Sequence, residues 1–218
     1  MKKYVKNILT DNVWWIFTAI TLIFFGTLYK MEFAVDTYAT LSFTIKEFIN
    51  QFASSGRFLL VVVGIIFKIL NFNNKAIYIL SYLMAIMCMV ISLYKLYSII
   101  KEDIGSKFLK ILIPILIVLN AFSLELFLFI EKGIMLFGVT MCIFAVGEIK
   151  KWLESKNKKY LILSGIFMLL ANFSYQGVVG IFVAISIIYI LKYSKNIKEF
   201  VINNICVALS YGIPAIID

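Results

Sequence analysis

Residues 13–29 have the sequence VWWIFTAITLIFFGTLY, which contains no charged residue and has two tryptophans, Trp14 and Trp15, next to its first residue. A helix of this length rises about 25 Å, and tryptophan favours the membrane–water interface, so the stretch predicts a transmembrane helix. The whole chain agrees with this reading, because 62% of its 218 residues are hydrophobic and only 15% are charged. Soluble domains have about 25% charged residues. The composition therefore predicts an integral membrane protein.

Six further apolar runs are long enough to be considered as membrane spans. They are residues 76–100, 108–121, 133–149, 160–175, 177–191 and 201–218. Inside a bilayer the backbone must satisfy its own hydrogen bonds, and long uninterrupted runs do so as helices. We therefore expect an all-α, polytopic bundle of about seven spans that forms one integral membrane domain over residues 1–218.

The apolar run at 58–67 (FLLVVVGIIF) is shorter, and as a helix it would rise only about 15 Å, half of a bilayer. The distribution of lysines decides how this run is interpreted. Fifteen of the 21 basic residues form four groups: Lys2, Lys3 and Lys6; Lys95, Lys101, Lys107 and Lys110; Lys150, Lys151, Lys156, Lys158 and Lys159; Lys192, Lys195 and Lys198. All four groups are cytoplasmic only if the short run does not cross. The pattern predicts a re-entrant or interfacial helix and a cytoplasmic N-terminus in the cell membrane.

Composition also excludes several classes of protein. The chain has no histidine, which excludes a histidine-based catalyst or metal site. Its three cysteines are odd in number and lie far apart in apolar runs, which excludes a secreted disulfide scaffold. The formal charge of +9 follows from the cytoplasmic lysines, so we expect membrane lipids and not nucleic acid as its surroundings.

Two charged residues of the first outer segment, residues 30–75, are candidates for chemistry. Asp36 follows the first span closely, at a depth where a carboxylate meets both lipid headgroups and water, so we interpret it as a general base. The alternative is a solvated loop acid. Arg57 is the one arginine beside 20 lysines, and its planar fork binds two phosphate oxygens at once, which favours a phosphate site. The alternative is a snorkelling anchor of the short helix.

Two other outer turns contain polar candidates. Glu125 and Glu131 lie on either side of an aromatic run in the second outer segment, residues 121–132. Their six-residue spacing puts them on different faces of a regular helix, and the alternative role is simply to end the flanking spans. Tyr175 and Gln176 form a third outer corner, where they could bind a sugar by stacking and hydrogen bonding or only join neighbouring helices.

The order of these motifs resembles the serotype-converting O-antigen glucosyltransferase family, the Gtr type II membrane proteins. The resemblance rests on Asp36, on Gly56-Arg57 before an apolar run, on residues 120–135 (NAFSLELFLFIEKGIM) and on residues 173–176 (FSYQ). It covers residues 10–218. It implies an inverting GT-C type enzyme that moves a glucosyl group from a polyprenyl-phosphate sugar donor to a cell-surface glycan acceptor on the outer side of the membrane.

The resemblance also implies site roles. Asp36 corresponds to the outer-loop base, and Glu131 corresponds to the acid of the second motif, with Glu125 as the other family position. With this chemistry, the guanidinium of Arg57 would bind the donor phosphate. Family members commonly have an Asp-Asp pair where this chain has Asp36-Thr37. This departure leaves a divalent metal open, and no other cofactor is implied. Family members are also typically longer, so the chain would correspond to their N-terminal part.

Two other classes of function compete with the transferase. A transporter or flippase of lipid-linked glycans also needs polar outer groups and a basic inner rim, but it predicts charged or broken-helix sites at mid-membrane, which the sequence does not clearly contain. A non-catalytic membrane subunit would use the same acids only for loop solvation. Loss of a glucosyl branch on deletion would favour the transferase, whereas loss of polymer export would favour the transporter.

Overall fold

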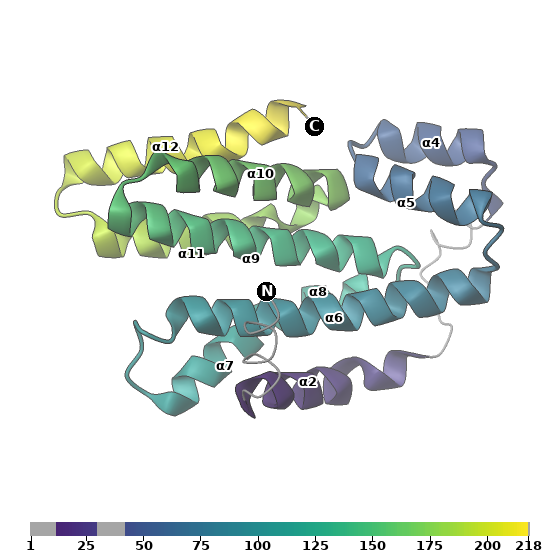
Figure 1. The fold of residues 1–218 in the computed structure, drawn as a ribbon, viewed down its shortest axis with the longest axis horizontal. Helices are drawn as coiled ribbons and strands as arrows, with labels where there is room; N and C mark the ends of the chain where they lie inside the picture. The colour runs from purple at the N-terminus through teal and green to yellow at the C-terminus, as the bar shows by residue number, and fades with distance from the viewer. Residues whose placement is uncertain (1–11, 30–41, 218) are drawn as a thin grey trace. The chain divides into compact units, whose positions relative to one another are not determined.

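The computed structural model describes residues 12–29 and 42–217, and within these ranges every regular element is a helix (Figure 1). The all-α prediction is therefore confirmed. The elements are α2 (Asn12–Phe25), η1 (Gly26–Tyr29), α4 (Ile45–Ala53), α5 (Phe58–Ile69), α6 (Asn74–Ile100), α7 (Lys107–Val118), α8 (Ala121–Leu126), α9 (Lys132–Ser155), α10 (Lys158–Ser174), η2 (Gln176–Val178), α11 (Val179–Tyr193) and α12 (Ile197–Ile217).

Four of the described helical segments are long and apolar enough to cross a membrane: α6, α9, α11 together with η2, and α12. A helix lies at each of the other three predicted spans, but α2 has 14 residues, α7 has 12 and α10 has 17. Helix α7 is short because Leu119 leaves the helical conformation (ψ 70°) and Asn120 caps the next helix. Several membrane helices are thus present, and the count of seven spans remains a prediction.

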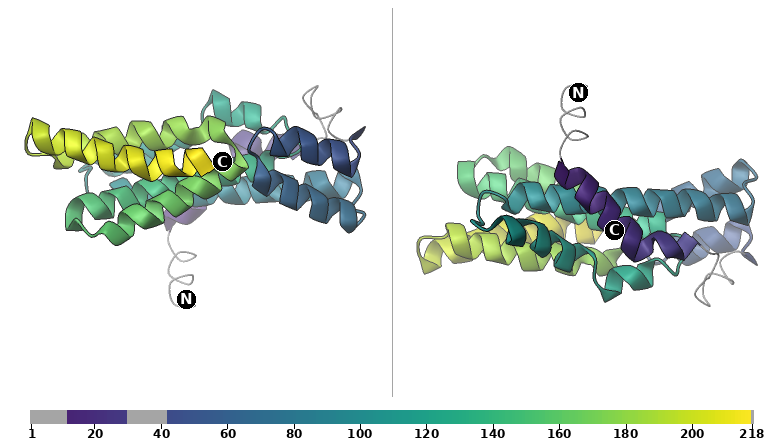
Figure 2. Two further views of the ribbon diagram at one scale, coloured as in Figure 1. Left: turned by 90° about the horizontal axis from the view of Figure 1, so that it is seen from above. Right: turned by 90° about the horizontal axis from the view of Figure 1, so that it is seen from below.

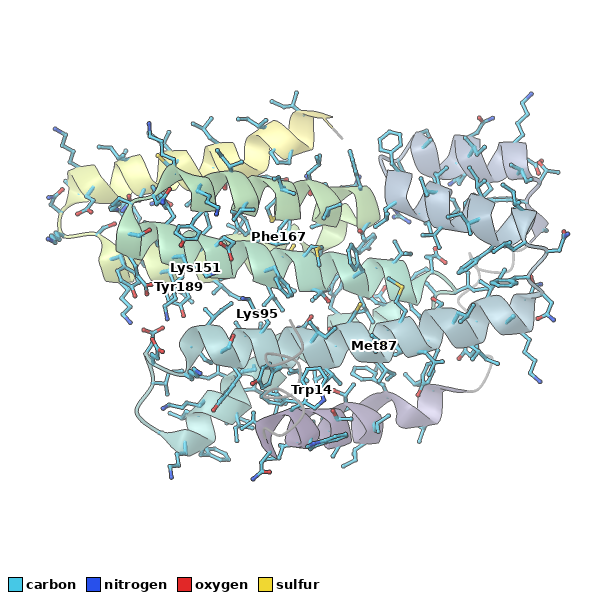
Figure 3. All side chains as sticks on the ribbon, viewed as in Figure 1. Trp14, Met87, Lys95, Lys151, Phe167 and Tyr189 are labelled. Carbon is cyan, nitrogen blue, oxygen red and sulfur yellow. The ribbon has the colours of Figure 1, made fainter. Side chains whose placement is uncertain are left out.

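The helices form two compact units. Of the described residues, the first unit contains 12–29, 42 and 72–136. Within it α6 contacts both α2 and α7. Aromatic pairs join α2 to α6, with the ring centroids of Trp14 and Tyr94 5.5 Å apart and those of Phe17 and Tyr97 6.1 Å apart (Figure 3). These edge-to-face contacts place the N-terminal half of α2 beside the C-terminal half of α6.

The second unit contains residues 43–71 and, of the rest of the chain, 137–217. Helix α10 contacts both α12 and α5, and α12 (yellow) runs alongside it in Figure 2. The N-terminal part of α9 packs on α10 through Gly138, where a side chain would meet Ser174 at 3.3 Å. Phe144 of α9 and Phe167 of α10 add a ring contact at 5.5 Å (Figure 3). The C-terminal end of α10, which leads into η2, is therefore held firmly.

Helices α4 and α5 form a hairpin within the second unit. The short apolar run predicted at 58–67 is present as α5, whose 12 residues rise about 18 Å, too little for a crossing. Helix α4 was not predicted. It begins with a capping box in which Thr44 and Glu47 bond reciprocally, and its Phe48 and Phe52 are buried, with Phe48 closely facing Gly64 of α5. This packing fixes the turn between the two helices.

Candidate functional site

The turn between α4 and α5 places Arg57 at the start of α5. Gly56 adopts the left-handed conformation (φ 74°), which a residue with a side chain adopts only at a cost. The backbone N–H of Arg57 then donates to the carbonyl of Phe52 at 3.0 Å, closing the turn. Ser54, Ser55 and Gly56 thus form a sharp turn.

The guanidinium of Arg57 lies over two aromatic rings. Its Cζ is 4.9 Å from the ring centroid of Tyr175 and 6.0 Å from that of Phe52. The Nε atom is buried and has no hydrogen-bond partner among the described residues. A guanidinium that lies on an aromatic face has N–H groups pointing along the ring plane, where they can donate hydrogen bonds to an anion. Phe52 was not anticipated from the sequence.

The corner between α10 and α11 brings two predicted residues to Arg57. Tyr175 ends α10 in an extended conformation (φ −167°, ψ 110°), and its N–H donates to Ala171 at 2.9 Å. The side-chain amide of Gln176 donates to the carbonyl of Ser55 at 2.8 Å. Arg57, Tyr175 and Gln176 are therefore neighbours in the second unit, and we name them, with Phe52 and Ser55, the arginine corner.

Eight of the ten lysines of the second unit gather at the other end of α9, α10, α11 and α12. They lie at the end of α9, the start of α10, the end of α11 and the start of α12: Lys150, Lys151, Lys156, Lys158, Lys159, Lys192, Lys195 and Lys198. Lys151 and Tyr189 mark this end in Figure 3. Helix α10 alone separates Lys158 from Tyr175 by 17 residues, about 25 Å. The Arg57 side of α10 is thus at the opposite end of that helix from these eight lysines, whereas Lys46 and Lys68 belong to the α4–α5 hairpin itself.

The acidic candidates of the second segment that was predicted to be outer, Glu125 and Glu131, belong to the first unit. Glu125 is exposed on α8, whereas Glu131 is partly buried directly before α9, so the two are on different elements. The regular helix that would have put them on different faces is broken between Leu126 and Lys132. Their predicted roles in substrate binding remain predictions.

Lys132 is a residue that sequence reasoning missed. It has no solvent-exposed surface, its Nζ is 4.0 Å from the ring centroid of Tyr78, and Glu131 interacts with it electrostatically. The next residue, Gly133, donates its N–H to the hydroxyl of Ser81 at 2.9 Å. A signal was available in the sequence, because Lys132 is one of the few basic residues outside the four lysine groups. We name Tyr78, Ser81, Glu131, Lys132 and Gly133 the lysine junction.

The lysine junction also anchors the end of the first helix. The hydroxyl of Tyr78 donates to the carbonyl of Leu28 at 2.6 Å, and that of Tyr82 lies 3.2 Å from the carbonyl of Phe25. Asp36, the predicted base, lies outside the described residues, so its placement stays a prediction. Within residues 12–29 and 42–217, no group of three or more potential metal-binding side chains occurs.

Comparison with known proteins identifies the family. A family model described as Glucosyl transferase GtrII matches residues 25–217 of the chain. This range contains both the arginine corner and the lysine junction, and it confirms the resemblance expected from the motifs. No curated protein and no solved structure matches the chain. The match extends over most of the 218 residues, and the chain belongs to the glucosyl transferase GtrII family, whose members are glycosyltransferases.

Proposed function

We propose that this protein transfers a glucosyl group from a polyprenyl-phosphate carrier to a cell-surface glycan on the outer side of the membrane. The family supports glucosyl transfer from a sugar donor to a glycan acceptor at the membrane. The lipid-phosphate form of the donor, the side of the membrane and the residues that act are the proposal.

The observation that supports this proposal is the arginine corner. When the sugar leaves its carrier, negative charge develops on the carrier phosphate, and a fixed cation stabilises that charge without reorganising. Arg57 is held by Tyr175 and Phe52 at 4.9 and 6.0 Å, so its orientation is set before a ligand binds. Lysine lacks the planar fork that contacts two phosphate oxygens together.

The lysine distribution supports the proposed orientation. The basic ends of α9, α10, α11 and α12 would lie in the cytoplasm by the positive-inside rule, with the N-terminus on the same side. The arginine corner, at the other end of the second unit, would then face the outer surface. A phosphate on a lipid carrier lies at headgroup level, where a partly exposed arginine can reach it.

The proposed reaction inverts the anomeric carbon in one displacement. Asp36 takes the proton from an acceptor hydroxyl, the hydroxyl oxygen bonds to the anomeric carbon, and the bond from that carbon to the phosphate oxygen breaks. The phosphate leaves with the electron pair, and Arg57 stabilises it. Glu125, Glu131 and Tyr175 are proposed to contact the sugars. A divalent metal is not required by this scheme.

Transfer reconstituted with a defined donor tests the proposal. The full chain is placed in liposomes with polyprenyl-phosphate glucose and a glycan acceptor, and transferred glucose is measured. We expect Arg57→Lys to raise the KM for the donor at least about tenfold, since a bidentate charged contact is lost.

Lys46→Arg is the matched control, because Lys46 is an exposed cation on α4 of the same hairpin. It should leave the donor KM within about twofold. Equal losses in the two variants would show that Arg57 is only a membrane anchor. Absence of transfer by the wild-type chain with this donor would overturn the lipid-phosphate proposal.

A further inference from the structure

The arginine corner contains one contact that bears on the two roles left open for Gln176, which were binding a sugar and joining neighbouring helices. Its side-chain amide donates to the backbone carbonyl of Ser55 at 2.8 Å, across 121 positions of the chain. Ser55 is separated from Arg57 by Gly56 alone. The amide of Gln176 is therefore engaged with the backbone of the turn that presents the arginine.

The residues on both sides of Arg57 contact the same segment, the α10–α11 corner. Gln176 holds Ser55, and Phe173 packs edge-on against Phe58 with ring centroids 5.4 Å apart. Between these two contacts, Tyr175 lies under the guanidinium at 4.9 Å. The α10–α11 corner and the α4–α5 turn therefore meet in antiparallel order, with Gln176 on Ser55, Tyr175 on Arg57 and Phe173 on Phe58.

The flexibility of Gly56 explains why the turn needs a contact from outside the hairpin. Gly56 has no side chain to restrict its torsions, so the turn would sample several conformations if nothing outside it were attached. The turn has its own bonds, from the N–H of Gly56 to Ala53 at 3.1 Å and from that of Arg57 to Phe52 at 3.0 Å, but both lie within the hairpin. The bond from Gln176 connects Ser55 to the α10–α11 corner, where Tyr175 is also fixed.

We infer that Gln176 is a positioning residue for Arg57 and not a ligand of the sugar. By fixing Ser55, Gln176 sets the guanidinium on Tyr175 in the orientation that accepts the phosphate of a lipid carrier. This inference rests on the proposed function, because it assigns the carrier phosphate to Arg57. It predicts that Gln176 contributes to binding of the carrier even when no sugar is attached.

Binding of polyprenyl monophosphate, which carries no sugar, tests the inference. The full chain in nanodiscs is titrated with this lipid, and donor KM and kcat are measured in parallel. Gln176→Met keeps the length of the side chain without a donor or a charge. We expect it to weaken carrier binding and to raise the donor KM by about fivefold to tenfold, with kcat unchanged at saturating donor.

Gln51→Met is the matched control, because Gln51 is an exposed glutamine on α4 of the same hairpin. It should change carrier binding by less than about twofold. If Gln176→Met binds the sugar-free carrier as the wild type does but loses the glucosylated donor, Gln176 is a sugar ligand and the inference is overturned.

A covalent replacement of the contact separates positioning from a loss of folding. The double variant Ser55→Cys with Gln176→Cys is made in a Cys206→Ala background, since Cys88 and Cys142 are buried. Bridging the pair with a short dithiol-reactive crosslinker should restore carrier binding to within about twofold of wild type, whereas the unbridged protein should stay weakened. Failure to crosslink, or crosslinking without restored binding, would overturn the inference.

The outcomes distinguish this inference from the proposed function. If the wild-type chain binds polyprenyl phosphate and Gln176→Met does so equally well, the inference fails and the proposed function stands. If the wild-type chain neither binds this lipid nor uses its glucosylated form, the proposed function fails, and the assignment of Gln176 to carrier binding fails with it. Crosslinking then still reports whether the contact exists.

Discussion

The arginine corner and the lysine junction each contain a cation placed on a tyrosine ring, but their surroundings differ. Arg57 is partly exposed, 4.9 Å from Tyr175, and the residues beside it are held by backbone and ring contacts. Lys132 is fully buried, 4.0 Å from Tyr78, with Glu131 next to it in the chain. Removing one partner of a buried charge pair is costly, whereas a partly exposed arginine is accessible to a ligand. The comparison therefore predicts a structural role for Lys132 and is consistent with the binding role proposed for Arg57.

The largest expected effect comes from the acids. We expect Asp36→Asn to reduce transfer at least about 100-fold, because an amide cannot accept the proton of the attacking hydroxyl. Glu131→Gln, in the lysine junction, should reduce transfer no more than about tenfold. The measurement is glucose transfer in liposomes, with membrane insertion checked by cysteine labelling. Full activity of Asp36→Asn together with loss in Glu131→Gln would move the base into the lysine junction.

Removing the buried cation tests the structural side of the comparison. Lys132→Met leaves Glu131 without its neighbouring charge, so we expect the free energy of unfolding to fall by roughly 2–4 kcal/mol. Arg57→Met should change it by less than about 1 kcal/mol, because Arg57 is partly exposed. Thermal unfolding of the purified protein measures both.

The double variant Lys132→Met with Glu131→Gln is the control for this pair. It should recover part of the lost stability, since the uncompensated charge is gone. If Lys132→Met were as stable as the wild type but bound the donor poorly, Lys132 would face a ligand and the distinction between the two regions would disappear.

The glycines of the two regions should respond differently to the same substitutions. Gly56 is required by its torsion (φ 74°), which asparagine also tolerates, whereas a side chain on Gly133 would come 2.8 Å from the carbonyl oxygen of Ser81. We expect Gly56→Asn to keep most donor binding and Gly56→Ala to destabilise the protein by about 1–2 kcal/mol.

At Gly133 both alanine and asparagine should destabilise, by about 1–3 kcal/mol, because the obstacle is backbone. Thermal unfolding of the four single variants gives the comparison. Equal responses of Gly56 and Gly133 to asparagine would contradict the structural account of both positions.

The smallest effect concerns the start of the α4–α5 hairpin. Hydrogen bonds from the backbone and the hydroxyl of Thr44 lower the pKa of Glu47 below its ordinary value. A carboxylate with a lowered folded pKa stabilises the fold above the ordinary pKa of about 4.3, and this contribution disappears as the pH falls through the lowered value.

We therefore expect Thr44→Ala to reduce stability by about 0.5–1 kcal/mol near pH 7 and to have less effect near pH 3. Unfolding measured at the two pH values checks the direction. Lys46→Arg on the same helix should show no such pH dependence. A Thr44→Ala effect that is the same at both pH values would exclude the capping box as its cause.

Much of the fold follows from local sequence, because apolar runs longer than a bilayer have one stable structure. The helices α6, α9 and α12 lie where those runs are, and α5 is short as its ten apolar residues predict. Helix α7 is shorter than its run, since Asn120 starts a new helix by capping it. Helix α4 had a recognisable signal in Thr44 and Glu47, which form its capping box.

The candidate site was only partly predictable. Arg57, Tyr175 and Gln176 were singled out by residue type, and the structure brings them together, but their roles stay predictions. The bond from Gln176 to Ser55 has no local signature, because it depends on packing between segments far apart in the chain. The same holds for Lys132, whose burial depends on its packing with α6.

The distance in sequence between Ser55 and Gln176 has a consequence for biogenesis. A ribosome adds roughly 5–20 residues per second, so the 121 positions between them delay their contact by about 6–24 s. Throughout that interval the α4–α5 hairpin has already been synthesised, but Arg57 lacks the ring of Tyr175 and Ser55 lacks its hydrogen bond from Gln176. The phosphate site proposed at Arg57 would consequently be completed late, once the α10–α11 corner has emerged and joined the earlier segment.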